Sequence, residues 1–500
     1  MAYFSVSWRD VVLYVGLAVF SWYMYKILIK PLLSPLRKIP GTPYVPFFGN
    51  MLEARKYEAM TNCIRWMKKL DSKIIRFYFF GGQERVLVAD PEIFQHILIT
   101  NSKYYDRVGD LSSGPLADLL RRPLFVLSGE HHHIVRKICN PGFSLKLIQG
   151  MVPIFQERAD ALIQLWTQGM QTQDGKTFGD INVQADLAKL TSDVICKCGF
   201  GYDMYTIENP DTPLVQPLRR LGPSASLRFL DLLPFAKWYP TKRNRQVWMD
   251  SKIIEELADK VLQQKKQMIG DKQSWKRPLT SLLNARDQEG GAMSNKDLFG
   301  EVIGFLFAGF ETTSIGMTWT LLQLAQFPDI QAKVREEVNQ VLKEHNGVIN
   351  NETLDKLKYL TCVIKETLRM LPPIVTMFRK AKRDDTLKGY HIPAGTIVGL
   401  HVGALHRLNW EDPDSFKPER FMEHIDNESR KFLPFAVGPY MCIGYKFALL
   451  EMKTVLARLI QEFDFKMSPG YSYKRQQALV LRPSPPARLL ATKILGQASE

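Results

Sequence analysis

The chain has 500 residues, of which 45% are hydrophobic and 23% are charged, and its formal net charge is +15. These proportions exclude a long disordered chain, and six scattered cysteines favour a reducing compartment over a disulfide-stapled secreted domain. The basic excess is not gathered in one run and comes with no zinc-finger, helix-turn-helix or RNA-binding signature, so no nucleic-acid partner is expected.

The first part of the chain carries a segment that is apolar enough to cross a membrane. The run VVLYVGLAVFSWYMY at residues 11–25, continued by residues 27–29, is just long enough to span a bilayer. A cleaved signal peptide is the alternative, but basic residues follow where a cleavage site would need small ones: Lys26, Lys30, Arg37 and Lys38. Because this positive charge follows the span, the downstream chain is predicted to lie on the cytoplasmic side.

Prolines interrupt the sequence that follows, KPLLSPLRKIPGTPYVP, where they disfavour helix and favour a stiff extended linker. We therefore expect three parts: an N-terminal membrane anchor at residues 1–30, a proline-rich hinge at residues 31–50 and a catalytic domain at residues 51–500.

Helical periodicity dominates this third part, for example at residues 251–266 and 350–369, where apolar residues recur at intervals of three and four. Strand-like runs are few. Residues 74–90, with two glycines in the turn, and residues 386–400 are each predicted to form a hairpin. The expected fold class is mainly α with small β-sheet regions.

One predicted helix, at about residues 298–327 and stopped by Pro328, is apolar on nearly all sides. Such a helix belongs in the core of a large protein or in a membrane. Glu311 and Thr312 interrupt its apolar surface directly after Gly309. A polar pair in a buried helix must either be hydrogen bonded or have a functional role, since a buried polar group without a hydrogen-bond partner costs about 1–3 kcal/mol.

Near the C-terminus, the sequence FLPFAVGPYMCIGYKF places Cys442 between glycines and just ahead of a predicted helix. Glycines in series mark backbone that turns tightly or approaches another group closely. A helix N-terminus stabilises a thiolate through its free amides and its dipole. A buried structural thiol is the alternative, but it does not explain the glycines.

These segments resemble motifs of the cytochrome P-450 haem-thiolate monooxygenases, eukaryotic microsomal type. FAVGPYMCIG resembles the family's cysteine loop, Phe-x-x-Gly-x-Arg-x-Cys-x-Gly, with matches at Phe435, Gly438, Cys442 and Gly444. AGFETT at residues 308–313 resembles its oxygen-activating motif, ETLR at residues 366–369 its Glu-x-x-Arg, and FKPERF at residues 416–421 its Pro-Glu-Arg-Phe segment. All four stand in family order, and the resemblance covers about residues 39–492.

The resemblance implies the P-450 fold, a triangular helical domain whose long central helix crosses the haem, and haem b as cofactor. Cys442 would be the axial ligand of the haem iron, with Ala308 and Gly309 beside the haem. Glu311 and Thr312 would deliver protons to iron-bound oxygen; the alternative is a threonine bonded to its own helix and an acid in a salt bridge. The resemblance also implies a structural charge triad that fixes the cysteine loop, formed by Glu366, Arg369 and Arg420.

By position, Arg136 and Arg379 correspond to the family's propionate-binding arginines. The sequence departs from the family pattern at two cofactor-binding positions: His132 stands where the family has tryptophan, and Tyr440 where it has arginine. A tyrosine hydroxyl offers a propionate one hydrogen bond and no charge.

The function expected from the resemblance is that of a monooxygenase anchored in the endoplasmic reticulum membrane, with its catalytic domain in the cytoplasm. It would insert one atom of O2 into an apolar substrate of the sterol, fatty acid or terpenoid class. Its electrons would come from an NADPH-dependent flavoprotein reductase, docked on the basic residues of the cysteine side. The alternatives are a haem-thiolate isomerase or dehydratase, which the pair at residues 311 and 312 disfavours, and a non-catalytic haem-binding protein.

Overall fold

The computed structural model describes residues 7–54, 56–108, 119, 123–209, 217, 220, 238–267, 295–422 and 430–494. The chain forms two compact units, a smaller one of Met1–Val108 and Thr376–Asn409 and a larger one of Gly109–Val375 and Trp410–Glu500. Helices predominate, and the strands form small sheets of two to five strands. The predicted fold class is therefore confirmed.

The smaller unit is built around a five-stranded sheet in the order β1-β2-β9-β6-β3. Its strands are β1 (Ile74–Tyr78), β2 (Glu84–Val88), β3 (Tyr105–Arg107), β6 (Thr376–Ala381) and β9 (Ile397–His401). Short helices accompany them: α3 (Met51–Ala54), α4 (Thr61–Lys69), α5 (Pro91–Gln95) and α18 (Val402–Leu408). The predicted first hairpin is confirmed, since β1 and β2 pair antiparallel and Gly81 and Gly82 turn between them at φ 69° and 71°.

The second predicted hairpin is only partly correct. Residues Asp385–Leu387 (β7) and Tyr390–Ile392 (β8) form a short hairpin, but β9 leaves it and lies parallel to β2 and antiparallel to β6. The reason is that β9 is buried on both faces: Val398 and Leu400 are buried on one face, and Gly399 and His401 on the other. A strand covered on both faces belongs inside a larger sheet rather than in an exposed hairpin.

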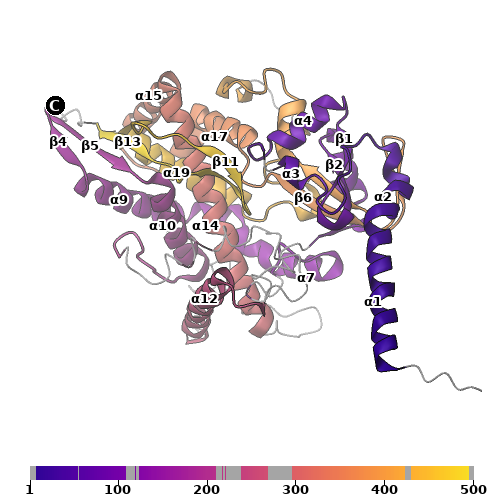
Figure 1. Ribbon diagram of the computed structural model, residues 1–500. Helices are drawn as coiled ribbons and strands as arrows, with labels where there is room; N and C mark the ends of the chain where they lie inside the picture. The colour runs from indigo at the N-terminus through magenta and orange to yellow at the C-terminus, as the bar shows by residue number, and fades with distance from the viewer. Residues whose placement is uncertain are drawn as a thin grey trace, which may run out of the picture. The chain divides into compact units, whose positions relative to one another are not determined.

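The N-terminus is a helix that projects from the smaller unit (Figure 1). It runs through α1 (Trp8–Met24), a π-helical turn (Tyr25–Ile29) and α2 (Lys30–Leu33). The stretch Trp8–Leu33 is long and apolar enough to cross a membrane, and only 6% of its apolar window is buried. Its end packs into the unit, however, because Ile27 is fully buried and its carbonyl accepts a hydrogen bond from the Tyr44 hydroxyl at 2.7 Å.

The prediction of an extended chain from the first proline onward is wrong for residues 31–38. Pro31 stands in the first turn of α2, and Pro35 in the first turn of a 3₁₀ helix, Pro35–Lys38. The first N–H groups of a helix have no partner within it, so a proline there loses nothing and its fixed φ suits the helix.

The larger unit contains most of the helices and two further sheets. Its helices are α7 (Gly129–Cys139), α8 (Leu145–Gln149), α9 (Val152–Gln168), α10 (Val183–Ile195), α12 (Lys242–Gln267), α14 (Asn295–Gln326), α15 (Pro328–Glu344), α16 (Asn351–Lys356), α17 (Lys358–Met370) and α19 (Tyr445–Glu462). One sheet has the order β10-β13-β5-β4, from β4 (Gln171–Gln173), β5 (Lys176–Ile181), β10 (Phe463–Met467) and β13 (Leu489–Lys493); β11 (Lys474–Gln477) pairs with β12 (Leu481–Ser484).

Helix α14 is the predicted long apolar helix, and it passes beside α10 within the larger unit (Figure 1). It is also long and apolar enough to span a membrane, but 78% of its apolar window is buried inside the protein. It packs against α10, α17, α19 and β10. Of the two environments that its composition allows, α14 therefore occupies the protein core.

The single helix predicted at residues 350–369 is two helices, α16 and α17, which meet at Leu357. A long-range contact explains the second start. The Glu337 carboxylate of α15 accepts hydrogen bonds from the backbone N–H groups of Tyr359 and Leu360, at 2.6 and 2.9 Å. A carboxylate on the free amides of a first turn stabilises that turn.

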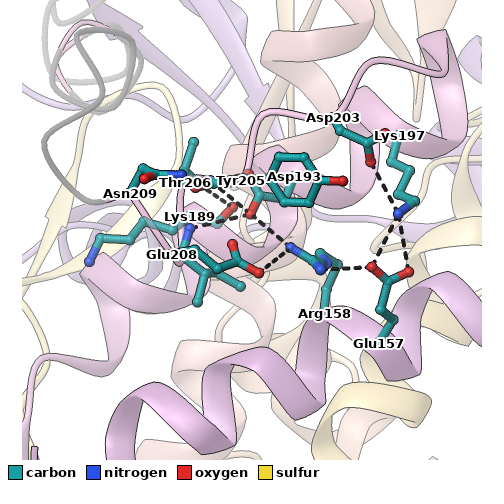
Figure 2. A network of polar contacts seen from close by, with 11 residues as sticks. Glu157, Arg158, Lys189, Asp193, Lys197, Asp203, Tyr205, Thr206, Glu208 and Asn209 are labelled. Atoms are coloured by element: carbon teal, nitrogen blue, oxygen red, sulfur yellow. Dashed lines mark hydrogen bonds and ion pairs between the residues drawn. The ribbon is translucent and has the colours of Figure 1, made fainter.

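A network of charged and polar side chains joins α9, α10 and the chain that follows α10 (Figure 2). Arg158 of α9 is buried and lies 2.8 Å from Glu208 and 3.8 Å from Asp193 of α10. The Asp193 carboxylate also accepts hydrogen bonds from the backbone N–H and the hydroxyl of Thr206. These partners compensate for the burial of both charges, so the network fixes α10, which packs against α14, to α9.

Candidate active site

The surface of α14 opens at one place. From Leu298 to Ala325 every residue is buried except Ala308, which is exposed, and Gly309 and Thr312, which are partly exposed. Positions i, i+1 and i+4 lie on neighbouring parts of one helix face. The predicted oxygen-activating motif is therefore the part of the helix that protein does not cover.

Two contacts give this face its shape. A Cβ atom at Gly309 would lie 2.8 Å from the Ile195 side chain of α10, so any larger residue would have to displace Ile195 to keep the two helices this close. The Thr312 hydroxyl donates a hydrogen bond to the Ala308 carbonyl at 2.8 Å. A purely structural threonine would make this bond to its own helix. The bond uses only the hydroxyl hydrogen, however, so the oxygen can still accept a hydrogen bond on the open face.

Glu311 lies on the buried side of the helix, next to the open face. Its carboxylate is 3.9 Å from the guanidinium of Arg482, which comes from β12. Burial raises the pKa of Glu311 to about 7, and the charge of Arg482 opposes this rise. A carboxyl that is half protonated near neutral pH can both give and take a proton.

The cysteine loop is a tight turn that leaves its thiol uncovered. The Cys442 N–H donates to the Phe435 carbonyl at 2.9 Å, and the Met441 N–H to the Gly438 carbonyl at 3.0 Å. Gly438 has φ 77°, a conformation that glycine adopts without strain. Cys442 is the exposed cysteine among the six, and α19 begins three residues later, directly after Gly444.

Helix α7 lies against this loop along one of its faces. The Arg136 guanidinium donates to the carbonyl of Met441 at 2.6 Å, and the Gly129 N–H donates to the Tyr440 hydroxyl at 3.1 Å. The rings of His132 and Tyr440 are 4.4 Å apart. The two positions at which the sequence departs from the family pattern are thus in contact with each other.

Arg136 carries a positive charge beside the thiol. Burial lowers the pKa of Arg136, and the charge of a Cys442 thiolate opposes that change. By the same attraction, the guanidinium favours the thiolate form of the cysteine, together with the N-terminal end of α19.

The predicted triad is assembled in the larger unit. Arg369 forms a two-pronged pair with the Glu366 carboxylate at 2.7 and 2.9 Å, and Arg420 reaches the same carboxylate at 3.0 Å. Glu366 and Arg369 are fully buried. The same two arginines hold the carbonyls of the segment before the cysteine loop, at Glu411, Asp412, Pro413 and Ser415. This arrangement suits the structural role expected of the three residues.

Arg379 lies in the smaller unit, on β6, where it is buried. Its guanidinium donates to the carbonyl of Phe378 at 2.9 Å.

Sequence reasoning missed two residues of the site. Phe143, just after α7, stacks on Phe305 of α14 with ring centroids 5.5 Å apart, and a Cβ atom at Gly444 would lie 3.8 Å from it. It therefore joins α14 to the cysteine loop. Arg482 is the other, and no local motif marks either residue.

The residues present fit a haem. The group needs an uncovered thiol as its ligand, a positive environment that favours the thiolate, and a flat wall of small residues on its other face. Cys442, Arg136 with the N-terminus of α19, and the open face around Ala308 have these properties.

Comparisons with known proteins agree with this geometry. The family model described as Cytochrome P450 matches residues 39–491. Cytochrome P450 72A552 of Barbarea vulgaris is 27% identical, over 98% of this chain and all of the relative. Cytochrome P450 72A397 of Kalopanax septemlobus is 32% identical over 84% of this chain and 81% of its own, and human Cytochrome P450 3A5 is 29% identical over 86% and 85%.

Proposed function

Because the chain belongs to the cytochrome P450 family and is a haem-thiolate monooxygenase, we propose that it oxidises an apolar substrate at the endoplasmic reticulum membrane. The substrate class would be sterol, fatty acid or terpenoid. The electrons would come from an NADPH-dependent flavoprotein reductase, and the cofactor would be haem b.

The observation that carries the proposal is the uncovered thiol of Cys442 at the start of α19, beside Arg136. A haem with a thiolate ligand supplies the activation of O2, because the sulfur donates electron density that favours O–O cleavage. The protein holds the thiolate through the tight turn from Phe435 to Cys442. The N–H groups at the N-terminus of α19 and the guanidinium of Arg136 stabilise its negative charge.

The open face of α14 and the buried side next to it have the groups that proton delivery requires. Thr312 holds its hydroxyl on the open face, and Glu311 stands beside it with a pKa raised to about 7. O–O cleavage consumes protons, so a relay from Glu311 through Thr312 would supply them at the reacting oxygen. An isomerase or dehydratase needs no such relay, and the presence of both groups therefore favours the monooxygenase.

Membrane attachment is supported by the exposed apolar helix Trp8–Leu33 and by the basic residues that follow its first part. A basic surface on the cysteine side would attract an acidic reductase domain; it includes Lys137, Arg430, Lys431 and Lys446.

Apolar side chains of α14 such as Phe305, together with residues 374–375 and the turn at residue 478 in the same larger unit, would contact the substrate. By resemblance to the family, residues 105–123 and 221–233 would also contribute to the pocket. All of residues 221–233 and most of residues 105–123 lie outside the described residues.

The proposal is tested by the spectrum of the reduced carbon monoxide complex. Cys442→Ala should abolish the red-shifted band of thiolate ligation, whereas Cys63→Ala, a partly buried cysteine of the smaller unit, should keep it. A band that survives in Cys442→Ala would show that another residue binds the iron. Reductase-dependent NADPH consumption, measured with palmitic acid, cholesterol and farnesol as probes, would separate a monooxygenase from an isomerase or a carrier.

A further inference from the structure

Glu311 and Arg482 form an open charge pair in the core of the larger unit. Their closest atoms, Arg482 Nη1 and Glu311 Oε1, are 3.9 Å apart, and both side chains are largely buried. Glu311 Oε2 and Arg482 Nη2 are buried and, among the residues that the structure describes, have no hydrogen-bond partner. Buried polar atoms without partners are costly, so their retention points to a use.

The charge pair of the structural triad is different in kind. There the Arg369 guanidinium closes on both oxygens of the Glu366 carboxylate, at 2.7 and 2.9 Å. A closed, two-pronged pair engages both carboxylate oxygens as acceptors and fixes the orientation of the carboxylate. At Glu311, by contrast, the Arg482 guanidinium attracts the carboxylate from 3.9 Å without fixing its orientation.

The backbone next to Arg482 is fixed to α14. The Trp319 indole N–H, two helical turns after Glu311, donates to the carbonyl of Leu481 at 2.8 Å. The Leu481 N–H donates in turn to the carbonyl of Pro373 at 2.8 Å. Because both backbone groups of Leu481 are held, β12 presents the neighbouring guanidinium to Glu311 at a fixed distance.

We propose that Arg482 is a positioning residue that holds Glu311 available for proton transfer to the open face of α14. This inference rests on the proposed monooxygenase function. Arg482 would act through Glu311, by its charge and by its fixed place on β12, and would not itself touch the substrate or the haem.

The electrostatics of the site agree with this role. Burial raises the pKa of Glu311, and among the described side chains around α14 the opposing charge comes from Arg482. Burial also lowers the pKa of Arg482, which the Glu311 carboxylate counteracts. Without the guanidinium, Glu311 would stay protonated to a higher pH and would return to its ionised form less readily.

The test is the titration of Glu311 itself in the full-length, haem-loaded protein. The carboxyl stretching band in pH-difference infrared spectra is assigned to Glu311 by its loss in Glu311→Gln. Arg482→Gln should move the midpoint of this band upward by at least about one pH unit, which is a tenfold change in proton affinity. Arg482→Lys should restore most of the parent value, since it keeps the charge.

Arg488→Gln is the matched control, because it removes an exposed arginine from the same C-terminal region, where it pairs with Asp180. Its midpoint should equal that of the parent. If Arg482→Gln does not fold, Trp319→Phe carries the test, since it removes the indole bond that holds β12 and should also raise the midpoint.

If folded Arg482→Gln has the same Glu311 midpoint as the parent and a normal thiolate band in its reduced carbon monoxide complex, the proposed role of Arg482 is wrong. The proposed function is then unaffected. Absence of that band from the parent protein would overturn the proposed function instead.

Discussion

Glu301, on α14 two helical turns before the open face, should destabilise the protein at neutral pH. Its side chain is buried, and it accepts one hydrogen bond, from the Leu124 backbone N–H. Burial raises its pKa from 4.5 to about 8, against the lowering effect of that bond, and Asp297 adds a further rise. The folded state therefore keeps a proton that the unfolded chain gives up above pH 4.5.

The sign and size of the effect follow from this difference. Because the folded-state pKa lies above the unfolded one, the free energy of unfolding falls as the pH rises from about 4.5 and levels off above about 8. About 2.5 pH units separate 4.5 from pH 7, and each corresponds to about 1.36 kcal/mol. The cost at pH 7 is therefore about 3 kcal/mol.

Glu301→Gln should remove this cost, since the amide is neutral at every pH and its carbonyl can still accept the Leu124 N–H. Guanidinium unfolding of the full-length protein in detergent, followed by tryptophan fluorescence, measures the gain. The variant's gain in the free energy of unfolding over the parent should be about 3.5 kcal/mol larger at pH 8 than at pH 5. Glu130→Gln, an exposed acid on α7, is the control and should show no such gain. A Glu301→Gln protein no more stable than the parent at pH 8 would refute the reasoning, because Glu301 would then be ionised and paired.

Thr312→Ala should bind haem normally but lower product per NADPH by about tenfold or more, with hydrogen peroxide released in its place; unchanged coupling would make Thr312 structural. Deleting residues 1–24 should leave the free energy of unfolding unchanged, whereas deleting residues 1–30 should lower it by about 1.5–3 kcal/mol, because Ile27 is fully buried; equal losses would contradict this boundary. His132→Trp and Tyr440→Arg should each speed haem transfer to apomyoglobin, and the double variant should be slower than either, since the two rings are in contact. Additive effects would show that the positions are independent.

The sequence predicted the parts of the fold whose signal is local. The apolar pattern of α14, the glycine turn between β1 and β2, and the cysteine loop before α19 can each be identified within some 30 residues. Where the observed secondary structure differs from the prediction, the cause is a contact with residues far away in the sequence. Glu337 caps the start of α17 from another helix, and the partners of β9 are strands β2 and β6. No local pattern of residues 350–400 contains this information.

The same distinction applies to the active site. Motifs predicted Cys442, Glu311 and Thr312 as site residues, because each belongs to a short run of residues that the expected chemistry constrains together. Arg482 reaches Glu311 from 171 positions away, and it does so only because Trp319 and Pro373 hold β12 in place. A residue that acts through tertiary position has no sequence signature of its own.

His132 and Tyr440 are separate departures in the sequence but a single feature of the structure. Their rings are 4.4 Å apart, and the Tyr440 hydroxyl accepts the N–H of Gly129, at the start of the helix that carries His132. An arginine at residue 440 would instead place a cation at that helix N-terminus, where the dipole is already positive, and would offer Gly129 no acceptor. With tryptophan at residue 132, the guanidinium could stack on the indole and recover part of this loss as a cation–π contact. Histidine at residue 132 with tyrosine at 440, or tryptophan at 132 with arginine at 440, can therefore join α7 to the cysteine loop. We expect a combination of one residue from each pair to join them less well. The exchange of arginine for tyrosine thus changes how the loop is held and leaves the proposed ligand, Cys442, in place.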